Sequence, residues 1–385
     1  MLVSDELFRP FGPLTSARFL SRPNRFLVEC DHEGRRTRAF LPNPGRLKEL
    51  LLPGACLYLT AEEAAGKRAT RYTVAGVERD GCPIMLHTHR TNDAARWLIE
   101  NRLIPGLEDA VVVRREVPMG RCRFDFLLRD GQGDILLEVK SCTLFGNRVA
   151  MFPDAITARG ARHLEELSAL AGKGTRAAVL FIVHWPHADT FMPDYHTDLH
   201  FARTLLSVRG SVRIIPVAVR WAPDLSLSRT VRLLHVPWPY IESEAQDRGS
   251  YILILRLEED RMLPFGAAGS FFFKRGFYLY AGSAMANLNA RIERHLRRRK
   301  SFHWHIDRLR EVSRVHAVLP VRSSARLECL IAAALRDIAA WSVAGFGSSD
   351  CACASHLFGM TADPLQTAGF HRLLQYFRMD RYAPE

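Results

Sequence analysis

The sequence has no hydrophobic run long enough to cross a membrane and no recognisable secretory leader. Its longest strongly apolar stretches, such as residues 177–183, have the length of a β-strand. The first residues, MLVSDELFRPF, show no basic start followed by an apolar segment, so we expect a cytoplasmic protein with no membrane partner. Cysteine is sparse and scattered apart from Cys351 and Cys353, which favours reduced thiols over a disulfide framework.

Glycine-rich phosphate loops are also missing. Neither GxGxxG nor GxxxxGK occurs, so a sugar-metabolic enzyme built on such a loop has no support. Arginine, by contrast, is abundant and supplies most of the excess behind the net charge of +12. Because a planar guanidinium matches phosphate, this charge favours nucleic acid as the partner: DNA, with RNA as a further candidate. The alternative is an arginine-rich protein that binds no nucleic acid, and no particular protein partner is indicated.

The length and the changing pattern along the chain predict several domains. Residues 1–85 mix short strand-like runs with turn signals, typical of a small barrel, and within them residues 42–54 predict a turn, one amphipathic helical segment and a second turn. Residues 86–236 alternate helices with strands, which indicates an α/β domain. Residues 237–248 are polar and rich in proline and predict a linker, after which residues 249–385 begin again with strands and continue with helices.

A charged hairpin lies within the α/β region, at residues 123–140. If its turn is centred on the Gly-Gln step, Asp125 lies opposite Glu138, and the period of two puts Arg123 and Lys140 on the same face. Two neighbouring carboxylates repel each other, and a divalent cation such as Mg²⁺ or Mn²⁺ relieves that repulsion by using both as ligands. Lys140 would then neutralise charge on an attacked phosphate or position a water molecule. The alternative is a solvated face with a cross-strand ion pair.

The helix that follows the hairpin adds to this pattern. Residues 158–171 have helical periodicity, and Arg159 and His163 lie four residues apart, so both side chains share one helix face. That face is a candidate wall of the same site.

Several ordered motifs show that residues 1–235 resemble the sugar fermentation stimulation protein A family. The matching stretches are RPNRF (22–26), LPNPGRL (41–47), RFDF (123–126), EVKS (138–141) and FPDAITARGARHL (152–164). The resemblance implies an N-terminal OB-like barrel, a PD-(D/E)XK nuclease-like domain, DNA binding and nuclease activity. On that pattern Asp125 and Glu138 would be metal ligands and Lys140 the catalytic lysine, with Arg159 and His163 facing the site.

The barrel also offers candidate contacts to nucleic acid. OB barrels bind single strands through a basic groove and stacked aromatic rings. The residues of these types are Arg25, Phe26, Arg46 and Tyr72, although each would serve equally well as a packing or turn residue.

Residues 249–385 resemble a divergent GIY-YIG endonuclease-like domain of unknown function. The stretches that carry this resemblance are GSY (249–251), FYLYAGS (277–283), HWHID (303–307) and SDCACASHLF (349–358). It implies that Tyr251 or Tyr280 helps to activate water, that Arg291 stabilises phosphate charge, and that Glu328 holds a divalent ion. A nuclease-like fold used only for binding is the alternative.

Two further clusters stand out in this region. The basic run Arg297, Arg298, Arg299 and Lys300 is a candidate phosphate contact or a solvated helix end. Cys351, Cys353 and His356 have the residue types of a Zn²⁺ site, with His303 or His305 as a candidate fourth ligand.

Together, residues and resemblances predict a multidomain protein of the β and α/β classes. It comprises an OB-like barrel (1–85), a PD-(D/E)XK nuclease-like α/β domain (86–236) and a GIY-YIG-like α+β domain (249–385). The expected activity is metal-dependent hydrolysis of phosphodiesters. The alternative is a non-catalytic DNA-binding regulator of sugar fermentation genes.

Overall fold

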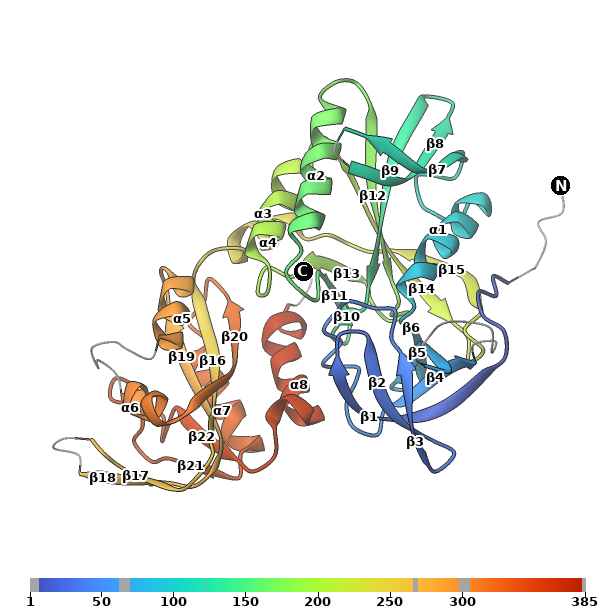
Figure 1. Ribbon diagram of the computed structural model, residues 1–385. Helices are drawn as coiled ribbons and strands as arrows, with labels where there is room; N and C mark the ends of the chain where they lie inside the picture. The colour runs from blue at the N-terminus through green and yellow to red at the C-terminus, as the bar shows by residue number, and fades with distance from the viewer. Residues whose placement is uncertain (1–6, 62–69, 121, 266–268, 298–304, 383–385) are drawn as a thin grey trace. The chain divides into compact units, whose positions relative to one another are not determined.

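The computed structural model describes residues 7–61, 70–120, 122–265, 269–297 and 305–382 (Figure 1). The chain divides into two compact units. Unit 1 contains residues 1–194 and 200–238, and unit 2 contains residues 195–199 and 239–385. Among the described helices, none is long and apolar enough to cross a membrane.

Unit 1 begins with the predicted barrel. Its strands are β1 (Leu14–Asn24), β2 (Leu27–His32), β3 (Arg35–Phe40), β4 (Cys56–Ala61), β5 (Tyr72–Arg79) and β6 (Cys82–Met85). They pair in the order β3-β2-β1-β4-β5-β6, and an additional parallel pairing of β3 with β5 closes the barrel. Alternate residues such as Leu57 and Leu59 are buried inside it, as the period of two in a strand requires. Strands β1 to β5, closed in this way, have the architecture of an OB-like barrel, and β6 extends β5.

The prediction of a helical segment within residues 42–54 is wrong. These residues form turns, because Leu47 has a φ of 52° and the chain therefore leaves the right-handed helical region there. The N–H of Leu47 donates to the carboxylate of Asp154 at 2.7 Å. A contact with a residue so far along the chain, rather than local helix propensity, determines this loop.

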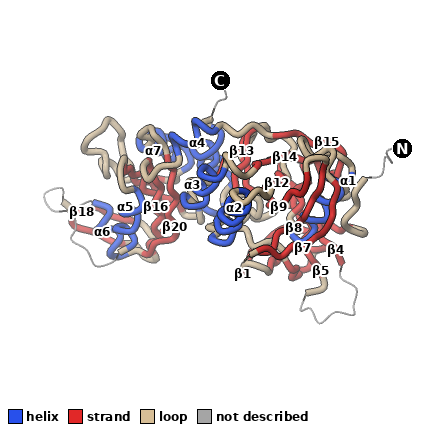
Figure 2. The backbone as a smooth tube through the Cα atoms, turned by 90° about the horizontal axis from the view of Figure 1, so that it is seen from above, coloured by secondary structure: helices blue, strands red, loops and turns tan. Residues whose placement is uncertain are grey.

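The second part of unit 1 is an α/β layer (Figure 2). Its sheet has the order β15-β14-β12-β9-β8-β7, and β9, β12 and β14 run parallel. Its strands are β7 (Val111–Met119), β8 (Cys122–Asp130), β9 (Gly133–Cys142), β12 (Arg176–Val183), β14 (Arg213–Trp221) and β15 (Leu227–Leu233). The helices are α1 (Thr91–Glu100), α2 (Ala158–Ala171) and α3 (Leu199–Val208), and a small separate sheet contains β10 (Leu144–Phe145), β11 (Val149–Phe152) and β13 (Thr190–Pro193).

Helices cover both faces of this sheet, which explains why β12 is apolar at almost every position. Val179 and Phe181 pack in the same cluster as residues of α2 and α3, whereas Leu180 and Ile182 pack in the cluster that contains residues of α1. A strand covered on both faces needs apolar side chains on both. Helix α2 begins at Ala158 because the side chain of Thr157 caps it by accepting the N–H of Gly160 at 3.0 Å.

Unit 2 is built on an antiparallel sheet of order β20-β16-β19-β22-β21. Its strands are β16 (Gly249–Leu257), β19 (Gly276–Ala284), β20 (Arg314–Arg322), β21 (Trp341–Ser342) and β22 (Leu357–Met360), with β17 (Arg261–Pro264) and β18 (Ser270–Phe273) as a separate pair. Residues of α7 (Glu328–Ile338) and α8 (Ala368–Gln375) pack on one face, and residues of α5 (Leu288–Leu296) and α6 (His305–Val312) pack on the other.

Residues 237–248, predicted as a linker, contain the point at which the chain passes from unit 1 to unit 2 and are partly helical. The first half of this segment forms helix α4 (Trp238–Glu244), with Pro239 in the first turn, where a missing N–H costs nothing. Ile241 and Glu244 are buried, and Glu244 accepts the N–H of Ser324 at 2.9 Å. From Pro239 onward the segment is therefore an anchored part of unit 2.

Candidate functional site

The hairpin of β8 and β9 has the predicted register. Phe126 pairs with Leu137, so Asp125 and Glu138 occupy the next opposing positions. Beyond that point β9 continues along β12, where Glu138 lies beside Val179. The two carboxylates therefore project from the point where the pairing of β8 with β9 ends, while β9 remains held on its other side.

Asp125 is held by two hydrogen bonds. Its Oδ2 accepts the backbone N–H of Val139 at 2.7 Å, and its Oδ1 accepts the side-chain amide of Asn92 at 2.7 Å. Burial and the nearby charge of Glu138 nevertheless raise the pKa of Asp125 to about 6. Asn92, on α1, was not predicted, because its sequence position carries no signal that links it to the hairpin.

Glu138 is only 4% exposed, and its two carboxylate oxygens differ. Oε1 accepts from His163 Nδ1 at 2.6 Å and from the ammonium group of Lys140. Oε2 is buried and has no hydrogen-bond partner within the described part of the chain. Burial opposes ionisation, but the hydrogen bond from His163 and the charge of Lys140 outweigh it and lower the pKa of Glu138.

Arg159 and His163 share a face of α2, as predicted, and form a relay to Glu138. Arg159 Nε donates to His163 Nε2 at 3.3 Å. Since a guanidinium only donates, Nε2 accepts and the proton of a neutral ring lies on Nδ1, which donates to Glu138. The ring also packs edge-on against Phe124, with centroids 5.9 Å apart. Because the ring is held in place by this packing, its hydrogen bond to Glu138 fixes the direction in which that carboxylate points.

Arg123 lies on the same face of β8 as Asp125, as predicted, because Phe124 and Phe126 are buried on the other face. Its guanidinium nevertheless turns to Glu116 at 3.1 Å and is mostly exposed. Sharing the face therefore does not bring this side chain into contact with the acidic pair.

A pocket of about 370 Å³ adjoins the acidic pair. It lies within unit 1, between loops of the barrel and the α/β layer, and Lys140 and Asn92 line it. Arg25, from the turn between β1 and β2, lines its barrel side. The pocket is thus bordered by a lysine of the acidic cluster and by an arginine of the barrel.

The other barrel candidates lie near this turn or away from the pocket. Arg22 donates to the backbone carbonyls of Arg25 and Arg46, each at 2.6 Å, and so holds the two basic loops together. Phe26 is 45% exposed and stacks on Phe40. Tyr72 is absent from the described pocket lining and packs against His32.

Unit 2 brings its four predicted residues together. Tyr251 on β16 and Tyr280 on β19 have ring centroids 6.3 Å apart, and Arg291 on α5 hydrogen-bonds Tyr251. Glu328, at the start of α7, interacts electrostatically with both tyrosines. His295 was not assigned a role from the sequence, yet its Nε2 lies 2.8 Å from the hydroxyl of Tyr251.

The tyrosines are buried phenols. Burial and the proximity of Tyr280 raise the pKa of Tyr251 well above its usual value, and burial raises that of Tyr280. Gly282 lies opposite Tyr251, and a Cβ there would be 2.4 Å from the phenol oxygen. The glycine of the YAG motif is thus required for the close approach of the Tyr251 side chain.

The predicted zinc ligands also meet, and Cys329 rather than His305 lies beside them among the described residues. Cys351, Cys353 and His356 are joined by Cys329 of α7, whereas His305 packs its ring against Phe265 and Phe346. No motif spacing in the sequence linked Cys329 to the other three residues. His303 lies outside the described residues.

The basic run after α5 is described only at its first residue. Arg297 is the C-cap of α5. Arg298, Arg299 and Lys300 lie outside the described residues.

The donor set of unit 1 fits a hard divalent cation. Asp125 and Glu138 offer carboxylate oxygens, the ligands preferred by Mg²⁺ and Mn²⁺, and Glu138 Oε2 is a buried oxygen without a hydrogen-bond partner among the described residues. Burying such an atom is costly unless a cation or a donor compensates for it.

Three family models match successive parts of the chain. The "SfsA N-terminal OB domain" matches residues 20–86, the "Sugar fermentation stimulation protein RE domain" matches 89–224, and "Domain of unknown function DUF123" matches 250–378. These matches confirm the expected sugar fermentation stimulation protein family and the expected domain of unknown function, while the GIY-YIG likeness of that domain stays a prediction. They also support the OB-like assignment of the barrel.

Curated relatives and one solved structure resemble the same region. A sugar fermentation stimulation protein homolog from Chloroflexus aurantiacus is 42% identical over 199 residues, covering 52% of this chain and 76% of that protein. A homolog from Methanothermobacter thermautotrophicus is 36% identical over 225 residues, covering 57% and 92%. The structure of Pyrococcus furiosus SfsA in complex with Ca²⁺ is 33% identical with a TM-score of 0.55, covering 60% of this chain and 99% of that chain.

Proposed function

Because this chain belongs to the sugar fermentation stimulation protein family, we propose that unit 1 binds DNA and cleaves it as a metal-dependent nuclease. RNA is a further candidate substrate. The observation that carries the proposal is the buried Oε2 of Glu138, which has no partner among the described residues and belongs to a carboxylate opposite Asp125.

The chemistry of the two carboxylates supports a cation between them. A bound Mg²⁺ or Mn²⁺ would supply Lewis-acid activation of water and of a phosphodiester oxygen. Asp125 and Glu138 would hold it, and the solved relative, described in complex with Ca²⁺, binds a cation that also prefers oxygen ligands. Without a cation, two facing carboxylates would repel the phosphates of a nucleic acid.

The surrounding residues give each carboxylate a fixed direction. Asn92 and the N–H of Val139 orient Asp125, and His163 orients Glu138. Groups held in this way need little rearrangement when charge develops in the reaction.

Lys140 connects the acidic pair with the pocket. It contacts Glu138 and also lines the pocket, so its ammonium group is placed to neutralise charge on a phosphate bound there. Arg25, which lines the same pocket from the barrel, would hold the phosphate backbone of the same nucleic-acid strand.

Cleavage of labelled single- and double-stranded DNA and RNA with Mg²⁺ or Mn²⁺ tests the proposal. We expect Glu138→Gln to reduce the rate by roughly a hundredfold or more, because a neutral amide is a poor ligand for the cation. Glu165→Gln, on the exposed face of the same helix as His163, is the matched control and should cleave normally.

Two results would contradict this function. One is wild-type protein that binds DNA but never cleaves it, which would favour a non-catalytic regulator of sugar fermentation genes. The other is equal cleavage by the wild type and Glu138→Gln. The C-terminal site is tested separately with Glu328→Ala, since loss of cleavage in that variant alone would move the activity to unit 2.

A further inference from the structure

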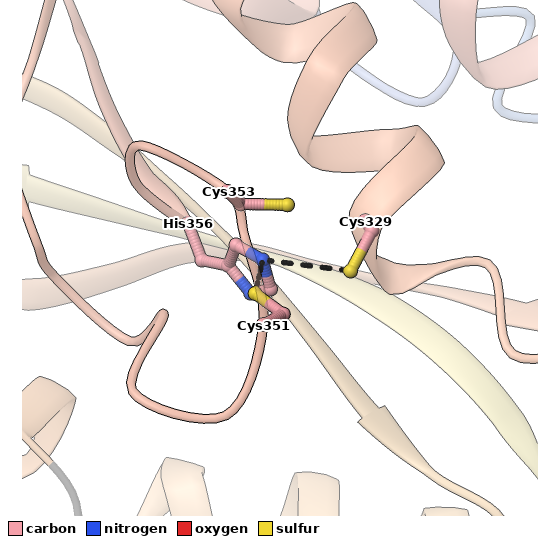
Figure 3. Close-up of side chains that lie close together, drawn as sticks. All are labelled: Cys329, Cys351, Cys353 and His356. Atoms are coloured by element: carbon pink, nitrogen blue, oxygen red, sulfur yellow. Dashed lines mark hydrogen bonds between the residues drawn. The ribbon is translucent and has the colours of Figure 1, made fainter.

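Three thiols and one imidazole converge in unit 2 (Figure 3). Cys329 comes from the first turn of α7, Cys351 and Cys353 from the loop that precedes β22, and His356 from the end of that loop. The four ligand atoms all lie within 4.8 Å of one another. The side chains point toward a common centre although they come from separate segments.

The distances match those in a tetrahedral zinc site. The Nε2 of His356 lies 3.4 Å from the sulfur of Cys351 and 4.0 Å from that of Cys329. With Zn–S bonds of about 2.3 Å, ligand atoms at the corners of a tetrahedron are about 3.8 Å apart. Only small side-chain shifts are needed for all four atoms to contact one ion.

We propose that Cys329, Cys351, Cys353 and His356 bind one zinc ion. Three thiolates and one imidazole are a usual ligand set for structural zinc, whereas Mg²⁺ and Ca²⁺ prefer oxygen ligands. All eight cysteines lie in the described part and are free thiols. A disulfide between two thiols of the cluster would not explain why a third thiol and a buried imidazole converge on the same point, whereas a zinc ion uses all four side chains as ligands.

The other nitrogen of His356 extends the site toward Glu328. Nδ1 lies 3.1 Å from Glu328 Oε1, and His356 is almost fully buried. The other carboxylate oxygen of Glu328 accepts from the hydroxyl of Ser283. A carboxylate that accepts from a metal-bound histidine fixes the tautomer and the direction of the ring, so Glu328 is a positioning residue for the zinc.

The zinc would tie to α7 a loop that is otherwise held mainly by hydrogen bonds to itself and to β22, such as that from the N–H of Gly345 to the carbonyl of Ala354 at 2.8 Å. Residues 343–356, all within the described part, form turns and bends without a helix or a strand. This loop lies against the candidate tyrosine site, because a Cβ on Gly347 would be 3.1 Å from the ring of Tyr280. The ion therefore connects the wall of that site to α7. The inference is independent of the activity proposed for Asp125 and Glu138.

Elemental analysis of the full-length protein, purified under reducing conditions without a metal-affinity tag, tests the site. We expect about one zinc per chain. Addition of Co²⁺ to the protein after zinc removal should produce visible d–d bands of tetrahedral cobalt and near-ultraviolet thiolate charge-transfer bands. The cobalt spectrum requires no variant, so it remains decisive if cluster variants fold poorly.

Cys329→Ser and Cys351→Ser should lose most of the zinc. The matched control is Cys82→Ser, because Cys82 also contacts a histidine ring, at 3.4 Å from His187 Nε2, but lies outside the cluster. Absence of both zinc and a cobalt spectrum in the wild type would overturn the proposal. Equal zinc loss in Cys82→Ser would overturn it as well.

The role of Glu328 is tested by zinc affinity rather than by activity. Competition with a chromogenic chelator should show that Glu328→Gln binds zinc roughly ten- to a hundredfold more weakly, with the stoichiometry unchanged. Glu311→Gln, exposed on α6, should match the wild type. Unchanged affinity in Glu328→Gln would show that the carboxylate does not support His356.

Discussion

Asp125 and Glu138 are neighbours, but their carboxylates accept hydrogen bonds from different kinds of donor, and their pKa values shift in opposite directions. One oxygen of Glu138 accepts hydrogen bonds from His163 and Lys140, and the pKa of Glu138 is lowered. Asp125 receives only neutral donors, from Asn92 and the backbone, and its pKa rises to about 6. The pair therefore separates into one carboxylate that ionises readily and one that is costly to ionise without a cation.

Because the pKa of Asp125 is raised, ionisation of this carboxyl lowers the free energy of unfolding by a measurable amount. The folded-state pKa lies above the unfolded value, so protonation of Asp125 stabilises the folded state at low pH, and this contribution is lost as the pH rises through about 6. With a chelator present, Asp125→Asn should be more stable than the wild type above pH 6, by up to about 3 kcal/mol. Asn92 can rotate its amide to present its oxygen to the new side chain.

Denaturant unfolding at several pH values measures this difference. The gain should disappear below about pH 4, where the wild-type carboxyl is protonated in both states. A gain that is the same at every pH would contradict the assignment of the effect to the charge of Asp125.

Gly282 is a second residue whose role follows from distance. In Gly282→Ala the new Cβ would lie 2.4 Å from the Tyr251 hydroxyl oxygen, so the ring must move within a packed cluster. We expect a loss of about 1–3 kcal/mol in the unfolding free energy. Gly131→Ala is the control, since no described atom lies within 4 Å of its added Cβ. Equal melting temperatures for the two variants would disprove the close approach.

At the scale of elements, the sequence predicts those helices and strands whose formation depends on the local pattern of apolar and polar residues. Apolar runs and periodicity gave α2 its bounds and indicated β12 and β14, because burial on one or both faces selects the residue types. The hairpin register followed from one turn position, which also paired Asp125 with Glu138. These features depend on neighbours within a few residues.

Several of the errors and omissions come from contacts over long sequence distances. The loop at 42–54 is held by Asp154 rather than by its own helical pattern. Asn92 and Cys329 join their sites from helices that carry no motif for them. One sequence alone gives no signal for such pairings.

Helix α4 provides a test at this scale. Glu244 is buried and accepts from Ser324 at 2.9 Å and from Arg381 at 3.3 Å. Glu244→Ala should destabilise unit 2 by about 2 kcal/mol, because both donors lose a buried acceptor. Glu242→Ala, exposed on the same helix, should have little effect. Thermal unfolding that is equally altered by both changes would argue that α4 is only a connecting segment.

At the scale of the whole molecule, the dominant quantity is the net charge of +12. Binding of DNA should release counterions, so a plot of log affinity against log salt concentration should be linear and steep. Arg25→Ala should reduce the magnitude of this slope by about 0.7 to 0.9, corresponding to one phosphate contact. Fluorescence anisotropy in metal-free buffer measures the slope without cleavage. A flat salt dependence would exclude phosphate contacts as the basis of binding.

The hydrogen bond from Val139 to Asp125 makes one backbone amide a reporter of the acidic pair. That N–H is protected by a side-chain carboxylate, whose position changes with its protonation and ligation. Its chemical shift and its rate of exchange with deuterium should therefore follow cation binding residue by residue. A single resonance in β9 would show when the two carboxylates are bridged, even under conditions in which no substrate is cleaved.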